Sequence, residues 1–167
     1  HRPMDAVDKI RAQWQAERPD LDTQPMAVMG RMARLAQHLA KGLDEVFDAH
    51  GLNASSFDVL ATLRRAGAPY RLSVKDLLAQ TMVTSGTMTN RLDRLEAAGL
   101  IARMPNPEDG RGFVIALTDH GLGTIDATVT AHVANQHRLI APLNDTERAQ
   151  LDALLSIWLA GFEPSDG

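Results

Sequence analysis

The chain has 167 residues, enough for one domain with a sizeable core, and its 44% hydrophobic content indicates a globular protein rather than a disordered one. No apolar run approaches the roughly 18 residues that span a membrane, and the first residues show no secretory signal pattern, so we expect a cytoplasmic protein. The absence of cysteine excludes disulfides and thiolate metal sites.

The formal net charge of −4 is unevenly distributed along the chain. The segment 53–118 holds eight Lys/Arg and six Asp/Glu, for a net charge of +2, whereas the remaining residues hold nine and fifteen, for −6. A mildly basic middle between acidic flanks favours a segment that faces a polyanion. The asymmetry is modest, so by itself it raises the expectation of nucleic-acid binding only slightly.

Two helices are expected before residue 53. Val7, Ile10 and Trp14 have the spacing of one apolar helix face. A second, longer helix begins near Gln24 and ends before Gly51. Its apolar stripe consists of Met29, Met32, Leu35, Leu39, Leu43, Val46 and Phe47. A helix with an apolar stripe of this length either forms the centre of the core or presents a surface to a partner.

The middle of the chain shows three helical patterns followed by two strand patterns. The helices are expected at 53–67, 73–81 and 84–98, and the strands at 100–105 and 113–118. Asn53 or Ser55 caps the first of these helices and Ser73 the second. The segment 68–72 reads as a loop, and the Pro- and Gly-rich segment 106–112 as a hairpin turn. This order is typical of a winged helix-turn-helix.

Two further helices follow. Thr118 caps a long helix that runs to about Leu139, and the last helix begins after Asn144, which forms a capping box with Glu147. We therefore expect a mainly α fold, a winged helix-turn-helix with a small β-hairpin wing and a helical dimerisation region. The expected boundaries are 1–52 for the N-terminal helices, 53–118 for the DNA-binding region, and 119–167 for the C-terminal helices, with both outer parts forming a homodimer.

The helix at 84–98 carries two arginines with different expected roles. Met88, Leu92 and Leu95 define its buried stripe; Arg91 borders this stripe, and Arg94 lies away from it. The outward face fits a reader of the major groove, because Asn bonds adenine and Arg bonds guanine. The alternative to DNA contact is that this helix face is simply solvated. For the hairpin turn at 106–112, the alternative is an ordinary exposed turn. The residues expected to contact DNA are Ser85, Thr87, Asn90, Arg94, Asp109 and Arg111.

The sequences "SGTMTNRLDRLEAAGLIAR" and "DGRGFVIALTDHG" resemble the recognition helix and the wing of the MarR family of dimeric winged-helix repressors. The resemblance covers nearly the whole chain, with one departure at Gly110, where members often carry a second arginine. It implies a homodimeric transcriptional regulator, expected to be a repressor, that binds a pseudo-palindromic operator in double-stranded DNA.

A narrower resemblance, to the urate-responsive branch of that family, rests on the extra N-terminal helix, "ERPDLD" and "FDVLATLRRAG". It implies a ligand site at Trp14, Asp58, Arg91 and Arg103, and a small anionic aromatic ligand such as urate that weakens DNA binding. A phenolic ligand, or no ligand, is the alternative. Trp14 could instead be a core anchor, and Asp58 with Arg91 a structural ion pair.

Other functions are weakly supported by the sequence. The six histidines lack the spacing of a metal site, and we expect no metal and no cofactor. No phosphate-binding glycine loop and no nucleophile elbow is present, so we expect no catalytic residues. An enzyme acting on a purine-like substrate is the alternative of a different class, and a dimeric scaffold that sequesters a protein is the third.

Overall fold

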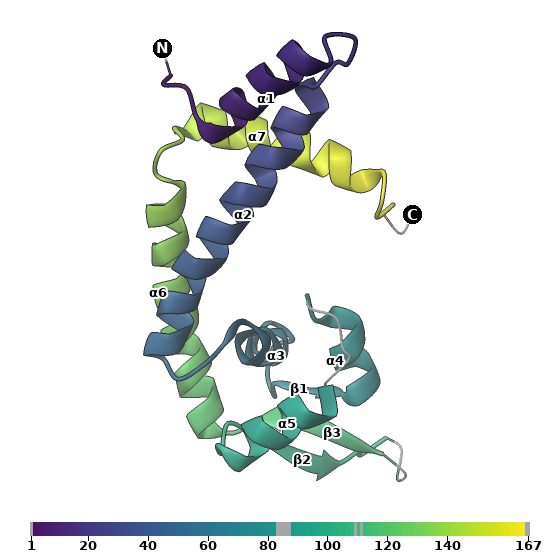
Figure 1. Ribbon diagram of the computed structural model, residues 1–167. Coiled ribbons are helices and arrows are strands. Elements are labelled where there is room, and N and C mark those ends of the chain that lie inside the picture. Colours follow the sequence, from purple (N-terminus) through teal and green to yellow (C-terminus); the bar gives the residue numbers. More distant parts are fainter. Residues whose placement is uncertain (1, 83–87, 109, 111, 166–167) are drawn as a thin grey trace.

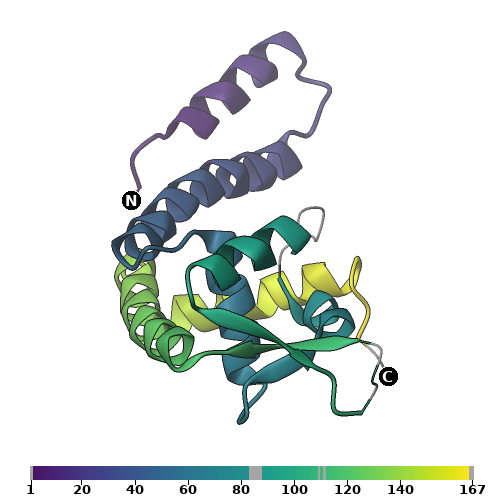
Figure 2. The same cartoon turned by 90° about the horizontal axis from the view of Figure 1, so that it is seen from below.

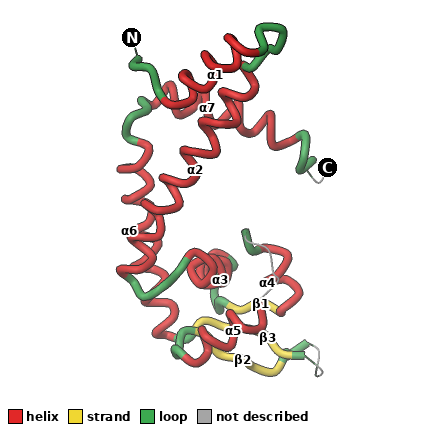
Figure 3. Tube along the Cα trace, in the orientation of Figure 1, coloured by secondary structure: helices red, strands yellow, loops and turns green. Residues whose placement is uncertain are grey.

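The computed structural model describes residues 2–82, 88–108, 110 and 112–165. Seven helices and three strands lie within these residues. In chain order they are α1 (Ala6–Glu17), α2 (Gln24–Ala49), α3 (Ala54–Arg65), β1 (Arg71–Ser73), α4 (Val74–Gln80), α5 (Met88–Ala97), β2 (Ile101–Pro105), β3 (Phe113–Leu117), α6 (Asp119–Ile140) and α7 (Asp145–Ala160). The expected mainly α fold with a small wing is confirmed (Figure 3).

The molecule has two parts of different character (Figure 1). The first, which we call the arm, comprises α1, α2, α6 and α7. In it α2 and α6 run side by side, α1 folds back along the start of α2, and α7 lies near that same end. The second, which we call the winged unit, comprises α3 to β3 and lies at the opposite end of α2. Viewed from below, α6 continues directly from β3 and joins the two parts (Figure 2).

The sheet of the winged unit has three antiparallel strands in the order β1-β3-β2. Its register pairs Ile115 with Leu72 on one side and with Arg103 on the other. The expectation of a loop at 68–72 was therefore wrong for its last two residues. A three-residue strand carries almost no local signal, and β1 forms because the free edge of β3 accepts it from a distant part of the sequence.

The core of the winged unit lies between its helices and the sheet. Its largest fully buried aliphatic side chains include Leu60, Leu63, Leu77, Ile101 and Ile115. Each such burial contributes about 1.5–3 kcal/mol. The same core cluster includes Phe47 of α2 and Ile125 of α6, so the arm helps to close it. The core also fixes α5, whose apolar stripe packs against it and whose opposite side faces outward.

Side-chain caps fix where several of the helices begin. Asn53 begins α3 with a capping box, in which the Ser56 N–H donates to Asn53 Oδ1 at 2.8 Å. Ser73 caps α4, and the predicted capping box of Asn144 with Glu147 is confirmed. Thr118 begins α6: its hydroxyl accepts from the Gly121 N–H at 2.9 Å and donates to the Gly99 carbonyl at 2.6 Å. This cap docks α6 onto the turn that follows α5.

The arm exposes much of its apolar surface. Every residue of α7 is at least partly exposed, although the helix is rich in leucine, isoleucine and tryptophan. The exposed apolar side chains of α2 and α7 are Met26, Val28, Met29, Met32, Leu35, Leu151, Leu154, Leu155, Ile157, Trp158 and Leu159. Within the described ranges, no helix is long and apolar enough to cross a membrane. The apolar faces of α2 and α7 are therefore available to a partner.

Candidate functional site

The outward face of α5 is the first element of the site. Met88, Leu92 and Leu95 are buried, as the sequence predicted, and hold the helix against the winged core. Asn90 and Arg94 are exposed on the other side. Four further residues predicted to contact DNA lie outside the described part of the chain; they are Ser85, Thr87, Asp109 and Arg111.

A cavity of about 480 Å³ opens beside this face. It is bounded by the end of α2, the turn before α3, the first turn of α3 and one side of α5. Its lining consists of Asp48, Gly51, Leu52, Asn53, Ser55, Ser56, Asn90, Arg91, Arg94, Leu95, Ala98 and Leu100. Asn90, Arg91 and Arg94 therefore belong both to α5 and to the wall of one cavity.

The cavity brings together two arginines that the sequence analysis had placed on separate faces. Positions three apart on a helix are neighbours, only about 60° apart around its axis. Arg91 therefore lines the wall nearer the core, and Arg94 lines the wall nearer solvent. Arg91, predicted to contact a ligand, and Arg94, predicted to contact DNA, therefore line the same cavity.

The electrostatics of the cavity favour an anion. Arg91 and Arg94 carry two positive charges against the single carboxylate of Asp48. The first turn of α3 adds the partial positive charge of a helix N-terminus. The Nη1 nitrogen of Arg91 is buried and, within the described residues, makes no hydrogen bond. A buried donor without an acceptor is costly, so an anion bound here would supply an acceptor that the free protein lacks.

Arg103, predicted as a ligand contact, is engaged in ion pairs. Its guanidinium lies 2.7 Å from Asp93 and 2.7 Å from Glu96, both on α5, and 5.9 Å from the ring centroid of Phe113. Hydrogen bonding to Asp93, assisted by Glu96, raises the pKa of Arg103 above its ordinary value. Arg103 thus ties β2 to α5 and lies outside the lining of the cavity.

Asp58, also predicted as a ligand contact, is buried in the middle of α3. One of its carboxylate oxygens accepts the Met82 N–H at 2.8 Å, and its carbonyl accepts the Thr62 hydroxyl at 2.6 Å. Asp58 therefore fixes the backbone of Met82, two residues after the end of α4. Arg103 is thus paired with α5 itself, whereas Asp58 holds Met82, which lies just after α4.

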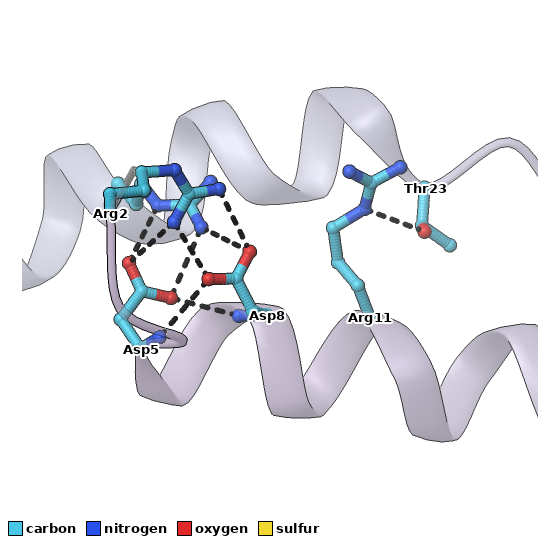
Figure 4. Close-up of polar contacts among 6 residues, drawn as sticks. Arg2, Asp5, Asp8, Arg11 and Thr23 are labelled. Carbon is cyan, nitrogen blue, oxygen red and sulfur yellow. Dashed lines mark hydrogen bonds and ion pairs between the residues drawn. The ribbon is translucent and has the colours of Figure 1, made fainter.

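Trp14, the fourth predicted ligand residue, lies on α1 and is 42% exposed. α1 is held to α2 at one end by the Arg11–Thr23 hydrogen bond of 3.2 Å (Figure 4). At the other end, Arg31 of α2 pairs with Asp5 and Asp8, and Arg2 also pairs with Asp8. These contacts, led by the hydrogen bond from Arg2, hold the pKa of Asp8 well below its usual range.

This attachment places Trp14 beside the start of α2, whereas α3 and α5 lie beyond its end (Figure 1). The 26 residues of α2 extend over about 39 Å at 1.5 Å per residue. Trp14 is therefore remote from Asp58 and Arg91 of the same chain, and the four predicted ligand residues do not assemble within one chain.

The sequence analysis did not predict the cavity wall that lies opposite α5, at the end of α2 and the start of α3. Asp48, Asn53, Ser55 and Ser56 line the cavity, but the sequence analysis treated Asn53 and Ser55 only as alternative helix caps. The polar run at the start of α3 was the available signal, because small hydroxyl residues at a helix N-terminus also suit an anion. In the described ranges no group of three or more His, Asp or Glu side chains is arranged to hold a metal ion.

Comparison with known proteins identifies the fold and its family. A model of the MarR family matches residues 50–112. The transcriptional regulator PecS of Dickeya dadantii is 44% identical over 149 residues, which cover 89% of this chain and 90% of PecS. Among solved structures, AbsC of Streptomyces coelicolor, a MarR family regulator, is 25% identical with a TM-score of 0.74, covering 87% of this chain and 97% of AbsC.

A mutant of MarR from E. coli, solved in complex with operator DNA, is 27% identical with a TM-score of 0.70. The match covers 82% of this chain and 97% of that protein. The identity to PecS extends over both the arm and the winged unit, so it includes more than a shared domain. The chain belongs to the MarR family of winged helix-turn-helix proteins, which are DNA-binding transcriptional regulators and not enzymes.

Proposed function

We propose that the protein is a cytoplasmic repressor that binds a pseudo-palindromic operator as a homodimer and loses affinity for DNA when a small anionic aromatic ligand, such as urate, binds. The observation that carries the proposal is the cavity in which Arg91 lies beside the exposed Asn90 and Arg94. In this proposal residues 53–118 bind DNA, and residues 1–52 and 119–167 form the dimer.

Contact with DNA is assigned to the outward face of α5 and to the wing. The E. coli MarR complex with operator DNA supports a similar docking, in which Asn90 and Arg94 enter the major groove. Two copies would place their α5 helices about 34–36 Å apart, in successive major grooves. The remaining proposed contacts are Ser85, Thr87, Asp109 and Arg111. Phosphate neutralisation makes the affinity fall steeply with salt.

Dimerisation is assigned to the apolar faces of α2 and α7. Two apolar grooves lie there; Leu35, Leu139 and Leu151 are among the side chains that line one, and Met32 and Trp158 are among those that line the other. Contiguous exposed apolar surface of this extent is unusual for a monomer. A second copy of the same face would bury it in a symmetric interface.

The ligand is assigned to the cavity. Its volume of about 480 Å³ is suitable for a small planar molecule. Urate is a planar monoanion at neutral pH, and the guanidinium of Arg91 can pair with two of its acceptors at once. Asp58 and Arg103 act through the position of α5, whereas Trp14 contributes only if a second copy of the chain completes the site.

The test is a fluorescence anisotropy titration of the protein on the intergenic DNA beside its own gene, with increasing urate. We expect urate to release the DNA, and Arg91→Ala to abolish this release while the variant still binds DNA. Arg34→Ala is the matched control, because Arg34 is an exposed arginine on α2, away from the cavity.

Three other results would each correct the proposal. DNA binding that responds to a phenolic acid such as salicylate, but not to urate, would keep the regulator and change the ligand. Binding that responds to neither would remove the ligand. Consumption of urate would support an enzyme instead.

A further inference from the structure

We propose that Arg103 is a positioning residue for DNA binding, which ties the hairpin of β2 and β3 to α5 through two carboxylates of that helix. The hairpin and α5 then reach DNA in one fixed arrangement. This inference deepens the proposed function, because it rests on contact of both α5 and the wing with DNA. It gives Arg103 a role in the free protein that requires no ligand.

The acidic residues of α5 are the first observation. Its ten residues hold two arginines and two acids, Asp93 and Glu96, so the formal charge of the helix is zero. Asp93 follows the exposed Asn90 by three residues and is therefore its neighbour on the helix surface. A carboxylate at this place repels phosphates and lowers the affinity for DNA. The two acids thus need another explanation, and both pair with Arg103.

Arg103 contacts the two carboxylates through separate nitrogens. Its Nη2 donates to Asp93 Oδ1 at 2.7 Å, and its Nη1 donates to Glu96 Oε1 at 2.7 Å. The other oxygen of Glu96 accepts the backbone N–H of Arg103 at 3.2 Å. The guanidinium also lies 5.9 Å from the ring centroid of Phe113 on β3. One residue of β2 therefore joins α5 to both strands of the hairpin.

These contacts support a strand at the edge of the sheet. In the order β1-β3-β2, one side of β2 is held by β3, and α5 packs close to β2 (Figure 1). A protein that contacts DNA through two elements gains affinity from their fixed spacing, because binding of one raises the effective concentration of the other. Loosening β2 from α5 would lose part of this gain without removing a contact to DNA.

A positioning role and a purely electrostatic role predict opposite signs. Asp93→Asn combined with Glu96→Gln removes two negative charges from α5. If charge alone mattered, this double variant would bind the operator more tightly. If positioning matters, it binds more weakly, because Arg103 has lost both of its charged partners. Arg103→Lys makes the complementary test, since lysine keeps the charge but lacks the planar fork that reaches two carboxylates.

The experiment is an anisotropy titration of the full-length protein on the labelled intergenic duplex at three salt concentrations. We expect the double variant of Asp93 and Glu96 to weaken binding about five- to twentyfold, and Arg103→Lys about three- to tenfold. The slope of log K against log salt should stay unchanged, because no phosphate contact is removed. Tighter binding by the double variant, or unaltered affinity of Arg103→Lys, would overturn the proposal.

Combining the substitutions tests whether the acids act through Arg103. In a protein that already carries Arg103→Gln, the substitutions at Asp93 and Glu96 should cause no further loss of affinity, because their shared partner is gone. A direct contact of Asp93 with a base would instead add its own loss. Losses that add up would therefore assign the acids to DNA and not to Arg103.

Glu108→Gln is the matched control. Glu108 is an exposed acid in the turn that follows β2, and its removal should leave affinity unchanged or tighten it up to about twofold. The melting temperatures of all variants should lie within about 4 °C of that of the unsubstituted protein, because exposed ion pairs contribute little to stability. Equal losses in Glu108→Gln, or a loss explained by unfolding at the assay temperature, would contradict a specific positioning role.

Arg94→Ala separates failure of this inference from failure of the proposed function. If Arg94→Ala weakens operator binding and the double variant of Asp93 and Glu96 does not, α5 still contacts DNA and only the positioning role is lost. If neither change weakens binding, α5 is not the contact surface, and both proposals fall.

Discussion

The arm and the winged unit bury their apolar residues in different ways. Leu60 and Leu63 of α3 are fully buried within the winged unit, whereas Leu154 and Ile157 of α7 are 64% and 73% exposed. Since all four are aliphatic residues on helices, helix formation alone does not account for the difference. The core around α3 is enclosed by the helices and sheet of the winged unit together with Phe47 of α2 and Ile125 of α6, whereas no residue of α7 is buried. The core around α3 is therefore complete within one chain, whereas the arm leaves an apolar face that the proposed dimer would bury.

The largest effect is expected at Gly121, where the start of α6 packs against the winged unit. A Cβ added at Gly121 would lie 1.9 Å from the Leu100 carbonyl oxygen, a backbone atom that cannot move aside cheaply. We expect Gly121→Ala to lower the free energy of unfolding by about 3 kcal/mol, because the start of α6 must shift away from the winged unit. Urea unfolding followed by circular dichroism measures it.

Gly123→Ala is the control, because no described atom lies within 4 Å of its added Cβ. In an exposed helical position this change should leave stability unaltered or raise it by up to about 1 kcal/mol. If both variants had the same urea midpoint of unfolding as the unsubstituted protein, the packing of α6 on the winged unit would not depend on the close approach at Gly121.

The exposed apolar side of the arm should be sensitive to charge. Leu154→Asp combined with Ile157→Asp places two charges on the apolar face of α7, where a second copy would bury them. We expect the dimer to dissociate at micromolar protein, with a loss in dimerisation of several kcal/mol, because each buried charge lacks a partner. Sedimentation equilibrium reports the mass.

Met104→Asp in the winged unit is the matched control for the charges placed on α7. Met104 is 42% exposed on β2, and Met104→Asp should leave the mass of a dimer unchanged. A dimeric double variant of α7, or a monomeric Met104→Asp, would place the interface elsewhere.

A smaller effect is expected from the outward face of α5. Arg94→Ala should weaken binding of the operator by about 1–3 kcal/mol, since it removes a charged contact to a base or a phosphate. If the contact is to a phosphate, the slope of log K against log salt should fall by about one. Anisotropy titrations at three salt concentrations measure both quantities. Unchanged affinity at every salt concentration would favour the scaffold that sequesters a protein.

The contrast between the two parts also separates what the sequence could predict from what it could not. The caps at Ser73, Thr118 and Asn144 were predictable, because a cap is a local bond between a side chain and a backbone N–H within three residues. β1 was missed because three residues carry little periodicity and its partner, β3, lies some 40 residues away in sequence.

The candidate site was predictable in its residue types but not in its assembly. Periodicity correctly placed Met88 inside and Arg94 outside on α5. It could not show that the end of α2 and the start of α3 close a cavity over Arg91, because three segments must first pack. Nor could a residue-by-residue resemblance show that α2 holds Trp14 away from Asp58 in the same chain.

The smallest predicted effect lies where the arm meets the winged unit. The ring of His132 on α6 stacks on Phe47 of α2, with centroids 5.0 Å apart, and lies 4.8 Å from Phe57 of α3. Burial lowers the pKa of His132 from its ordinary value of 6.5, because the charged ring would lose solvation. Its Nδ1 is buried and, within the described ranges, makes no hydrogen bond.

The sign of the pH effect follows from this lowered pKa. As the pH falls below about 6.5, the unfolded chain takes up a proton at His132 that the folded chain resists, so the free energy of unfolding decreases. The decrease levels off once the folded state is protonated too. His132→Phe keeps an aromatic ring between Phe47 and Phe57 but cannot titrate, so it should lose less stability than the parent between pH 7.5 and 5.5. Thermal unfolding at both pH values gives the difference, and parallel losses in the two proteins would show that this joint does not sense protons.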